Sequence, residues 1–239
     1  MKDISVIFPA YNEVERIRPT LHSFDQELAK TAYNYELLVV DDGSTDGTAD
    51  FVESLRILIP NLRVIRCVEN QGKGHAVKVG MLNALGKIRV MADADGATPA
   101  SELKALVQPI LDGKADISIG SRYVEGAIIA KKQPWYRRVW SRLANRVIQR
   151  VLLPGIVDTQ CGFKAFRAEA ADVAFNYVKT NGWSFDLEIL AYAKSKGFRI
   201  REVPVCWTDD ERSKGKFWDA PKTIVELYRI RKRLKLQGA

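Results

Sequence analysis

The chain has 239 residues, of which 46% are hydrophobic and 28% are charged, and its formal net charge at pH 7 is +8. These values are typical of one α/β domain with a substantial core. We expect no transmembrane helix, because the sequence contains no run of 18 apolar residues. The two histidines and three scattered cysteines show no regular metal-ligand spacing, so a histidine triad or a zinc site is poorly supported.

Apolar runs alternate with helical patterns along the first half of the chain. The runs predict five strands, at residues 4–9, 36–40, 62–65, 88–92 and 115–120. Helices are predicted from Asn12 to about Thr31, from Ser44, from Gly72 to about Leu85 and from Pro99, with Asn12, Ser44 and Asp46 as caps. This alternation predicts an α/β fold, with a mostly parallel central sheet and helices on both faces.

Acidic residues follow the predicted strands directly. Asp41-Asp42 ends the second strand, and Asp93 and Asp95 come after the fourth, while Pro9 to Tyr11 follows the first. Ligands bind beyond the carboxyl ends of such strands, so these segments should form one site. Two carboxylates spaced by one residue suit Mg²⁺ or Mn²⁺, and a cation held there could bind a substrate diphosphate.

The positive charge is concentrated in two segments. Residues 131–150 contain seven Lys/Arg and no acid, and residues 222–236 contain six Lys/Arg and one acid. Arg138, Arg142, Arg146 and Arg150 recur every four residues and would form one stripe on a helix, next to apolar rows. Such helices are expected on anionic lipid, where each basic residue contributes roughly 1 kcal/mol. The alternative is a core-packed helix with a solvated basic face.

Several motifs resemble those of known enzymes. The segments FPAYNE (8–13), VDDGSTDGT (40–48), NQGKG (70–74) and DAD (93–95) look like family 2 glycosyltransferases with the GT-A fold. A second set is similar to the dolichyl-phosphate glucosyltransferase branch, which neighbours the dolichyl-phosphate mannose synthases: DADGAT (93–98), GSR (120–122), DTQCGFK (158–164) and FDLE (185–188). The domain this resemblance implies spans residues 1–217 and includes an acceptor-side amphipathic segment, 131–153. Residues 218–239 would then be a basic amphipathic C-terminal helix.

The resemblance implies roles for individual residues. The nucleotide-sugar site would consist of Pro9, Tyr11, Glu13, Val40, Asp42, Lys73, Asp93, Ala94 and Asp95. Asp93 and Asp95 would hold the Mg²⁺ or Mn²⁺, and the catalytic set would comprise Asp93, Asp95, Arg122, Asp158 and Gln160. The acceptor phosphate would meet Arg122, Arg138, Lys164 and Lys214. Mannose synthases have a glutamine where this chain has Ala97, which leaves a third metal ligand there in doubt.

The expected activity is an inverting transfer of a hexose, with glucose from UDP-glucose favoured, to polyprenyl or dolichyl phosphate. One alternative uses GDP-mannose, and another uses a hydroxyl acceptor with Asp158 or Asp186 as base. A nucleic-acid-binding protein would explain the pI of 9.4 but not the acidic strand ends. A catalytically silent nucleotide-binding subunit also remains open. We expect a cytoplasmic enzyme, peripheral on the cytoplasmic face of an anionic membrane, with no nucleic-acid partner.

Overall fold

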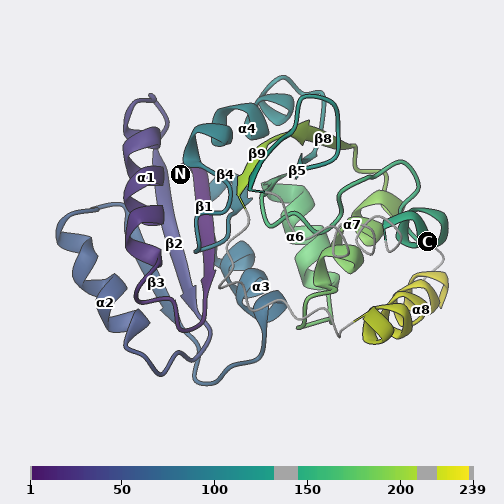
Figure 1. Cartoon of the computed structure of the whole chain (residues 1–239), viewed down its shortest axis with the longest axis horizontal. Helices are drawn as coiled ribbons and strands as arrows, with labels where there is room; N and C mark the ends of the chain where they lie inside the picture. Colours follow the sequence, from purple (N-terminus) through teal and green to yellow (C-terminus); the bar gives the residue numbers. More distant parts are fainter. Residues whose placement is uncertain (1, 132–144, 209–219, 237–239) are drawn as a thin grey trace.

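The computed structural model describes residues 2–131, 145–208 and 220–236, and Figure 1 shows their arrangement. Its strands are β1 (Lys2–Ala10), β2 (Tyr35–Asp41), β3 (Leu62–Arg66), β4 (Gly86–Met91), β5 (Ile117–Ser121), β6 (Ile128–Lys131), β7 (Lys164–Arg167), β8 (Ile200–Pro204) and β9 (Cys206–Thr208). Its helices are α1 (Ile17–Ala29), α2 (Thr48–Ser54), α3 (Lys73–Asn83), α4 (Leu103–Leu111), α6 (Ala168–Tyr177), α7 (Phe185–Ser195) and α8 (Ala220–Leu236), with short 3₁₀ turns η1 (Leu55–Ile57) and η2 (Ala100–Glu102). Residues 145–151 are also helical.

Seven strands form one mixed sheet in the order β3-β2-β1-β4-β7-β5-β8. All neighbouring pairs are parallel except those of β7, which runs antiparallel to both β4 and β5. The carboxyl ends of the six parallel strands therefore meet at one rim, and the amino end of β7 lies at that same rim. The strands β6 and β9 form a separate parallel pair.

Side chains alternate between the two faces of the sheet, and each face has its own core. Helices α1, α2 and α4 cover one face through residues such as Leu21, Val52 and Leu106. Helices α3, α6, α7 and α8 contribute to the core of the other face. The continuous aliphatic composition of β1 and β2 follows from this burial on both sides.

The start of α1 differs from the sequence expectation. The helix begins at Ile17, and Asn12 has a left-handed backbone conformation with a φ of 55°. The Asn12 side chain accepts a hydrogen bond from the Thr45 N–H at 2.9 Å, and the Asn12 N–H donates to the Ser44 hydroxyl. The cap prediction for Asn12 and Ser44 is therefore wrong, because these side chains join two loops of the rim. Asp46 does accept the Thr48 N–H at the start of α2.

The C-terminal helix α8 packs against the domain beside α7, far from α1 and α2 (Figure 1). Its apolar residues Leu227, Ile230 and Leu234 are buried in the same core as α7. Its exposed basic residues are Arg229, Arg231, Lys232 and Lys235. The described part of this amphipathic helix thus directs its apolar side into the protein and presents a basic surface. This arrangement matches the alternative of a core-packed helix with a solvated basic face, not a helix whose apolar side lies on lipid.

Candidate active site

Loops from four strand ends surround a cavity of about 290 Å³ at the rim of the sheet. Its walls come from the ends of β1, β2 and β4, from the loop between β3 and α3, from the start of α3 and from the loop before α7. The lining residues are Pro9, Ala10, Tyr11, Glu13, Arg16, Asp42, Asn70, Gly72, Lys73, Ala76, Asp93, Ala94, Asp95 and Trp183. The strand-end segments predicted from the sequence to converge therefore do lie together.

Lys73 pairs with one of the two carboxylates, Asp93 and Asp95, that line the cavity. The Lys73 ammonium, at the start of α3, lies 2.5 Å from Oδ1 of Asp93. Burial is the largest single influence and raises the pKa of Asp93, but the hydrogen bond and charge of Lys73, together with the charges of Lys164 and Arg122, lower that pKa overall. Burial and the charge of Asp93 both raise the pKa of Asp95. The two carboxylates thus repel each other in the absence of further positive charge.

The loop that carries Lys73 is held in place by Asp42 on one side. The buried Asp42 carboxylate accepts the Gly72 N–H at 2.7 Å and the Gln71 N–H at 3.3 Å. It also lies 3.3 Å from the Nδ1 atom of His75. Asp42, predicted to bind a nucleobase, therefore also orders the loop, although it still lines the cavity.

On its other side, the same loop packs against residues 180–182. The N–H of Gly74 donates to the Asn181 carbonyl oxygen at 2.7 Å. A side chain at Gly72 would sit 2.7 Å from that same oxygen, and the φ of Gly72, +104°, is one that other residues rarely adopt. The sequence NQGKG is glycine-rich because the chain passes this close to its neighbour.

Two lining residues with a charged or aromatic side chain were missed by the sequence analysis. Trp183 is half exposed, and its ring lies 5.0 Å from the Lys73 ammonium. Arg16 forms two hydrogen bonds with the carboxylate of Glu13, at 2.6 and 2.7 Å. Trp183 could have been noticed as a tryptophan in an otherwise polar segment before α7. Arg16 could not, because it lies in a segment that was predicted to be helical.

The predicted catalytic residues Arg122 and Asp158 form a pair near the cavity. Arg122 donates from its backbone N–H, Nε and Nη2 to the two oxygens of Asp158, at 2.7–2.9 Å. The guanidinium of Arg122 also lies 5.2 Å from the Trp207 ring. Burial would raise the pKa of Asp158, but Arg122 lowers it. Both groups lie outside the cavity lining, and Asp158 is fully buried.

Lys164 and Asp186 form a second buried pair. Lys164, predicted to meet the acceptor phosphate, is fully buried and donates to Asp186 and to the Cys161 carbonyl oxygen, both at 2.5 Å. Its ammonium is consequently turned into the protein, where it pairs with Asp186 at the start of α7. Burial raises the pKa of the Cys161 thiol to about 11, which agrees with a structural cysteine.

The remaining predicted residues fall into two groups. Val40 is buried beneath the rim, and Gln160 is exposed away from the cavity lining. Arg138 and Lys214, together with most of the basic segment 131–153, lie outside the described residues. Within the described part, Arg146 and Arg150 are exposed while Ile148 is buried. No helix of the described residues is long and apolar enough to cross a membrane.

Comparisons with known proteins agree with this geometry. Residues 5–175 match the family model of glycosyl transferase family 2. The chain is 37% identical to a dolichyl-phosphate beta-glucosyltransferase of Trichomonas vaginalis over 94% of this chain and 69% of that protein. It is 35% identical to a human dolichyl-phosphate beta-glucosyltransferase, over 100% of this chain and 77% of that protein.

The fold is also similar to that of solved structures. One is the crystal structure of glucosyl-3-phosphoglycerate synthase from Mycobacterium tuberculosis in complex with Mn²⁺, uridine-diphosphate-glucose and phosphoglyceric acid. The TM-score is 0.68 at 18% identity, and the match covers 97% of this chain and 80% of that chain. The predicted GT-A fold is thereby confirmed.

Proposed function

The chain belongs to glycosyl transferase family 2 and, within it, to the dolichyl-phosphate beta-glucosyltransferases, and we propose that it transfers glucose from UDP-glucose to dolichyl or polyprenyl phosphate. The observation that supports this most directly is the cavity in which Lys73 and the pair Asp93 and Asp95 lie together at the strand ends. A nucleoside diphosphate needs positive charge for its phosphates, and this site can supply it in two ways.

The first source of positive charge is a divalent cation. Asp93 and Asp95 present hard carboxylate oxygens, which suit Mg²⁺ or Mn²⁺. The charge of Asp93 raises the pKa of Asp95, so a cation between them would relieve a repulsion that the protein contains. When bound, the cation would neutralise charge on the leaving UDP. Ala97 offers its N–H to Asp95 at 3.0 Å but no side-chain ligand.

The second source is Lys73. Its ammonium lies at the amino end of α3, where the helix dipole also favours a negative charge. We propose that Lys73 contacts the donor diphosphate and that Pro9, Tyr11 and Asp42 hold the base and ribose. Glu13 would act together with Arg16, because their side chains are already paired.

The choice of acceptor depends on whether a nearby carboxylate is available as a general base. A hydroxyl acceptor needs a general base, but the oxygens of Asp158 are bound by Arg122, and Asp186 is buried against Lys164. A lipid phosphate is already an anion at neutral pH and needs no base. Its oxygen would form the bond to C1 of glucose as the bond from C1 to UDP breaks, which inverts the anomeric centre.

The partly exposed Arg122 is the described residue that we propose for the acceptor phosphate. Arg138 and Lys214 remain in that proposal on sequence grounds alone. Arg146 and Arg150, with the basic surface of α8, would attract the protein to anionic lipid on the cytoplasmic face of a membrane. Such an attraction would bring the enzyme to the surface where a lipid phosphate is found.

The test is a transfer assay with the purified chain and Mn²⁺. UDP-glucose and GDP-mannose are each combined with a short polyprenyl phosphate, with the same prenol lacking phosphate, and with phosphoglyceric acid. We expect UDP-glucose, but not GDP-mannose, to yield a glycolipid with polyprenyl phosphate. A chelator should abolish this product. Product from GDP-mannose, or equal transfer to the unphosphorylated prenol, would contradict the proposed substrates. No product from any pair would contradict the activity itself.

A further inference from the structure

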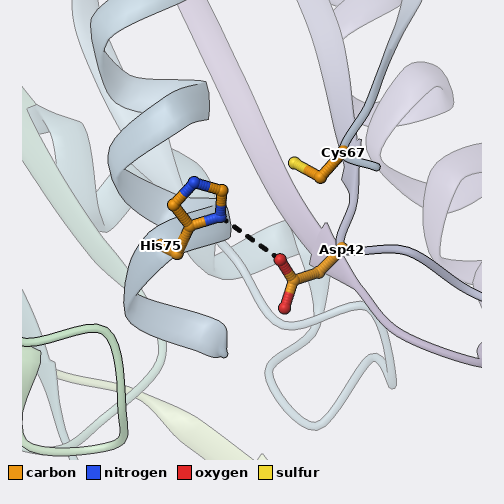
Figure 2. Close-up of side chains that lie close together, drawn as sticks. All are labelled: Asp42, Cys67 and His75. Carbon is orange, nitrogen blue, oxygen red and sulfur yellow. Dashed lines mark hydrogen bonds and ion pairs between the residues drawn. The ribbon is translucent and has the colours of Figure 1, made fainter. Parts of the chain in front are cut away.

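Three side chains of different chemistry meet next to the cavity, one of them being Asp42 in its lining. They are drawn in Figure 2. Asp42 follows β2, Cys67 follows β3, and His75 lies in the first turn of α3. One carboxylate oxygen, the Cys67 sulfur and one ring nitrogen of His75 all lie within 4.8 Å of one another. Figure 2 shows the His75 ring and the Asp42 carboxylate facing each other, with the Cys67 side chain directed to the same space.

The spacing of these atoms fits a small tetrahedral ion. Two ligands held about 2.0–2.1 Å from Zn²⁺ at a tetrahedral angle lie about 3.3 Å apart. The distance from the His75 Nδ1 atom to the Asp42 Oδ1 atom is 3.3 Å. A sulfur ligand at about 2.3 Å needs a spacing of about 3.5–3.6 Å to its nitrogen and oxygen neighbours. The Cys67 sulfur lies within 4.8 Å of both atoms, so a shift of at most about 1.3 Å would bring it into place.

Backbone hydrogen bonds hold two of the three groups in place. The N–H groups of Gln71 and Gly72 donate to Asp42, which fixes the orientation of the carboxylate. The N–H of Cys67 donates to the Asp41 carbonyl oxygen at 2.8 Å, which keeps the end of β3 next to Asp42. Such outer partners orient metal ligands and contribute to affinity. His75 and Cys67 are only partly buried, so an ion can reach them.

We propose that Asp42, Cys67 and His75 form a binding site for Zn²⁺, separate from the Asp93 and Asp95 pair. Thiolate and imidazole ligands favour zinc, whereas Mg²⁺ and Mn²⁺ prefer oxygen ligands. Three protein ligands leave a fourth position for water, as in zinc sites that stay open. No short motif indicated this site, because its ligands come from three different elements of the chain.

Zinc at this site would also affect glucose transfer, an effect that rests on the proposed function. Asp42 lines the cavity as well as facing Cys67 and His75. An Asp42 carboxylate that binds zinc has one oxygen fewer for a nucleobase. Zinc would also tie α3 to the end of β3 and so fix the loop that carries Lys73. We therefore expect Zn²⁺ to compete with UDP and to inhibit transfer.

The binding test uses Co²⁺ as a spectroscopic substitute for zinc, with excess Mg²⁺ present to occupy oxygen-only sites. We expect thiolate-to-cobalt charge-transfer absorption in the wild type, removed by adding Zn²⁺. Cys67→Ser should abolish this absorption, and His75→Ala should weaken cobalt affinity by more than about 10-fold. The matched controls Cys206→Ser and His22→Ala should behave as the wild type, since both residues lie outside the cluster.

Absence of the absorption in the wild type, or its persistence in Cys67→Ser, would overturn the site. Thermal unfolding of each variant separates lost ligands from lost folding. A second titration measures UDP binding with and without Zn²⁺. A UDP affinity that zinc leaves unchanged would overturn the competition. The cobalt result does not depend on transfer activity, so failure of the glucosyltransferase assay and failure of the zinc site are told apart.

Discussion

Gly162 determines where the carboxylate of Asp93 can lie, which makes Gly162→Ala a sharp test of the acidic pair. A Cβ atom added at Gly162 would sit 2.0 Å from Oδ2 of Asp93 and 2.4 Å from its Cγ. Ordinary contact begins at 3.4 Å, so the carboxylate would have to move by about 1.4 Å. The φ of Gly162 is not in the left-handed region, so alanine itself is tolerated and the strain falls on Asp93.

The size of the effect follows from how precisely such a site must be built. Metal–ligand distances hold within about 0.2 Å, and a misplacement of about 1 Å near reacting groups costs about 100-fold in rate. The shift also breaks the 2.5 Å contact with Lys73. We expect kcat/KM for glucose transfer to fall by about 100-fold or more. Stability should fall by only about 1 kcal/mol, because the short side chain can rotate away.

The assay measures transfer and Mn²⁺-dependent UDP binding for Gly162→Ala and for Gly182→Ala. The control glycine has nothing within 4 Å of its added Cβ and also lacks a left-handed φ. Gly182→Ala should therefore match the wild type in both measurements. Wild-type transfer by Gly162→Ala would refute the reasoning, since it would mean that the observed position of Asp93 is not needed.

Asp95→Asn should abolish transfer but stabilise the metal-free protein at neutral pH, because a raised pKa means that ionised Asp95 is less favourable in the folded than in the unfolded chain. That gain should vanish below about pH 3.9, the usual aspartate pKa, and thermal unfolding across pH tests the sign. Exchanging Arg146 and Arg150 for Gln should weaken binding to anionic vesicles by about 30-fold, at roughly 1 kcal/mol each, and leave neutral vesicles unaffected; unchanged anionic binding would indicate a merely solvated face. Arg233→Gln leaves the buried Glu188 without its 2.8 Å partner. This substitution should lower the free energy of unfolding, measured in urea, by about 2 kcal/mol. That is less than the roughly 3–5 kcal/mol lost when a fully buried pair is broken, because Arg233 is 33% exposed. An unchanged unfolding midpoint would contradict this.

Much of the fold could be predicted because the parallel strands are nearly continuous aliphatic runs. Strand β2 is buried along its whole length, and the apolar run 36–40 predicted it to within one residue at each end. The convergence of Asp42 and Asp93 followed from the same pattern, since the carboxyl ends of parallel strands share a rim. Lys73 was placed beside them only by the family resemblance. Buried-strand periodicity therefore located most of the cavity wall.

The antiparallel strand β7 could not be predicted in the same way. It has only four residues, Lys164–Arg167, and begins with a charged side chain that a periodicity argument reads as exposed. Lys164 is nevertheless fully buried, because Asp186, 22 residues later, neutralises it. The sequence shows a cation there but not its partner. The same holds for Arg122, whose partner Asp158 is 36 residues away.

These two pairs change how the acceptor side of the protein has to be understood. A cation counted from the sequence as available to a lipid phosphate is free for that role only where no internal carboxylate takes it. Lys164 is fully committed to Asp186, whereas Arg122 remains 17% exposed beside Asp158. Buried pairs of this kind fix geometry more than they add stability. If the proposed activity is correct, Asp158 therefore serves to aim Arg122 at the acceptor rather than to remove a proton from it.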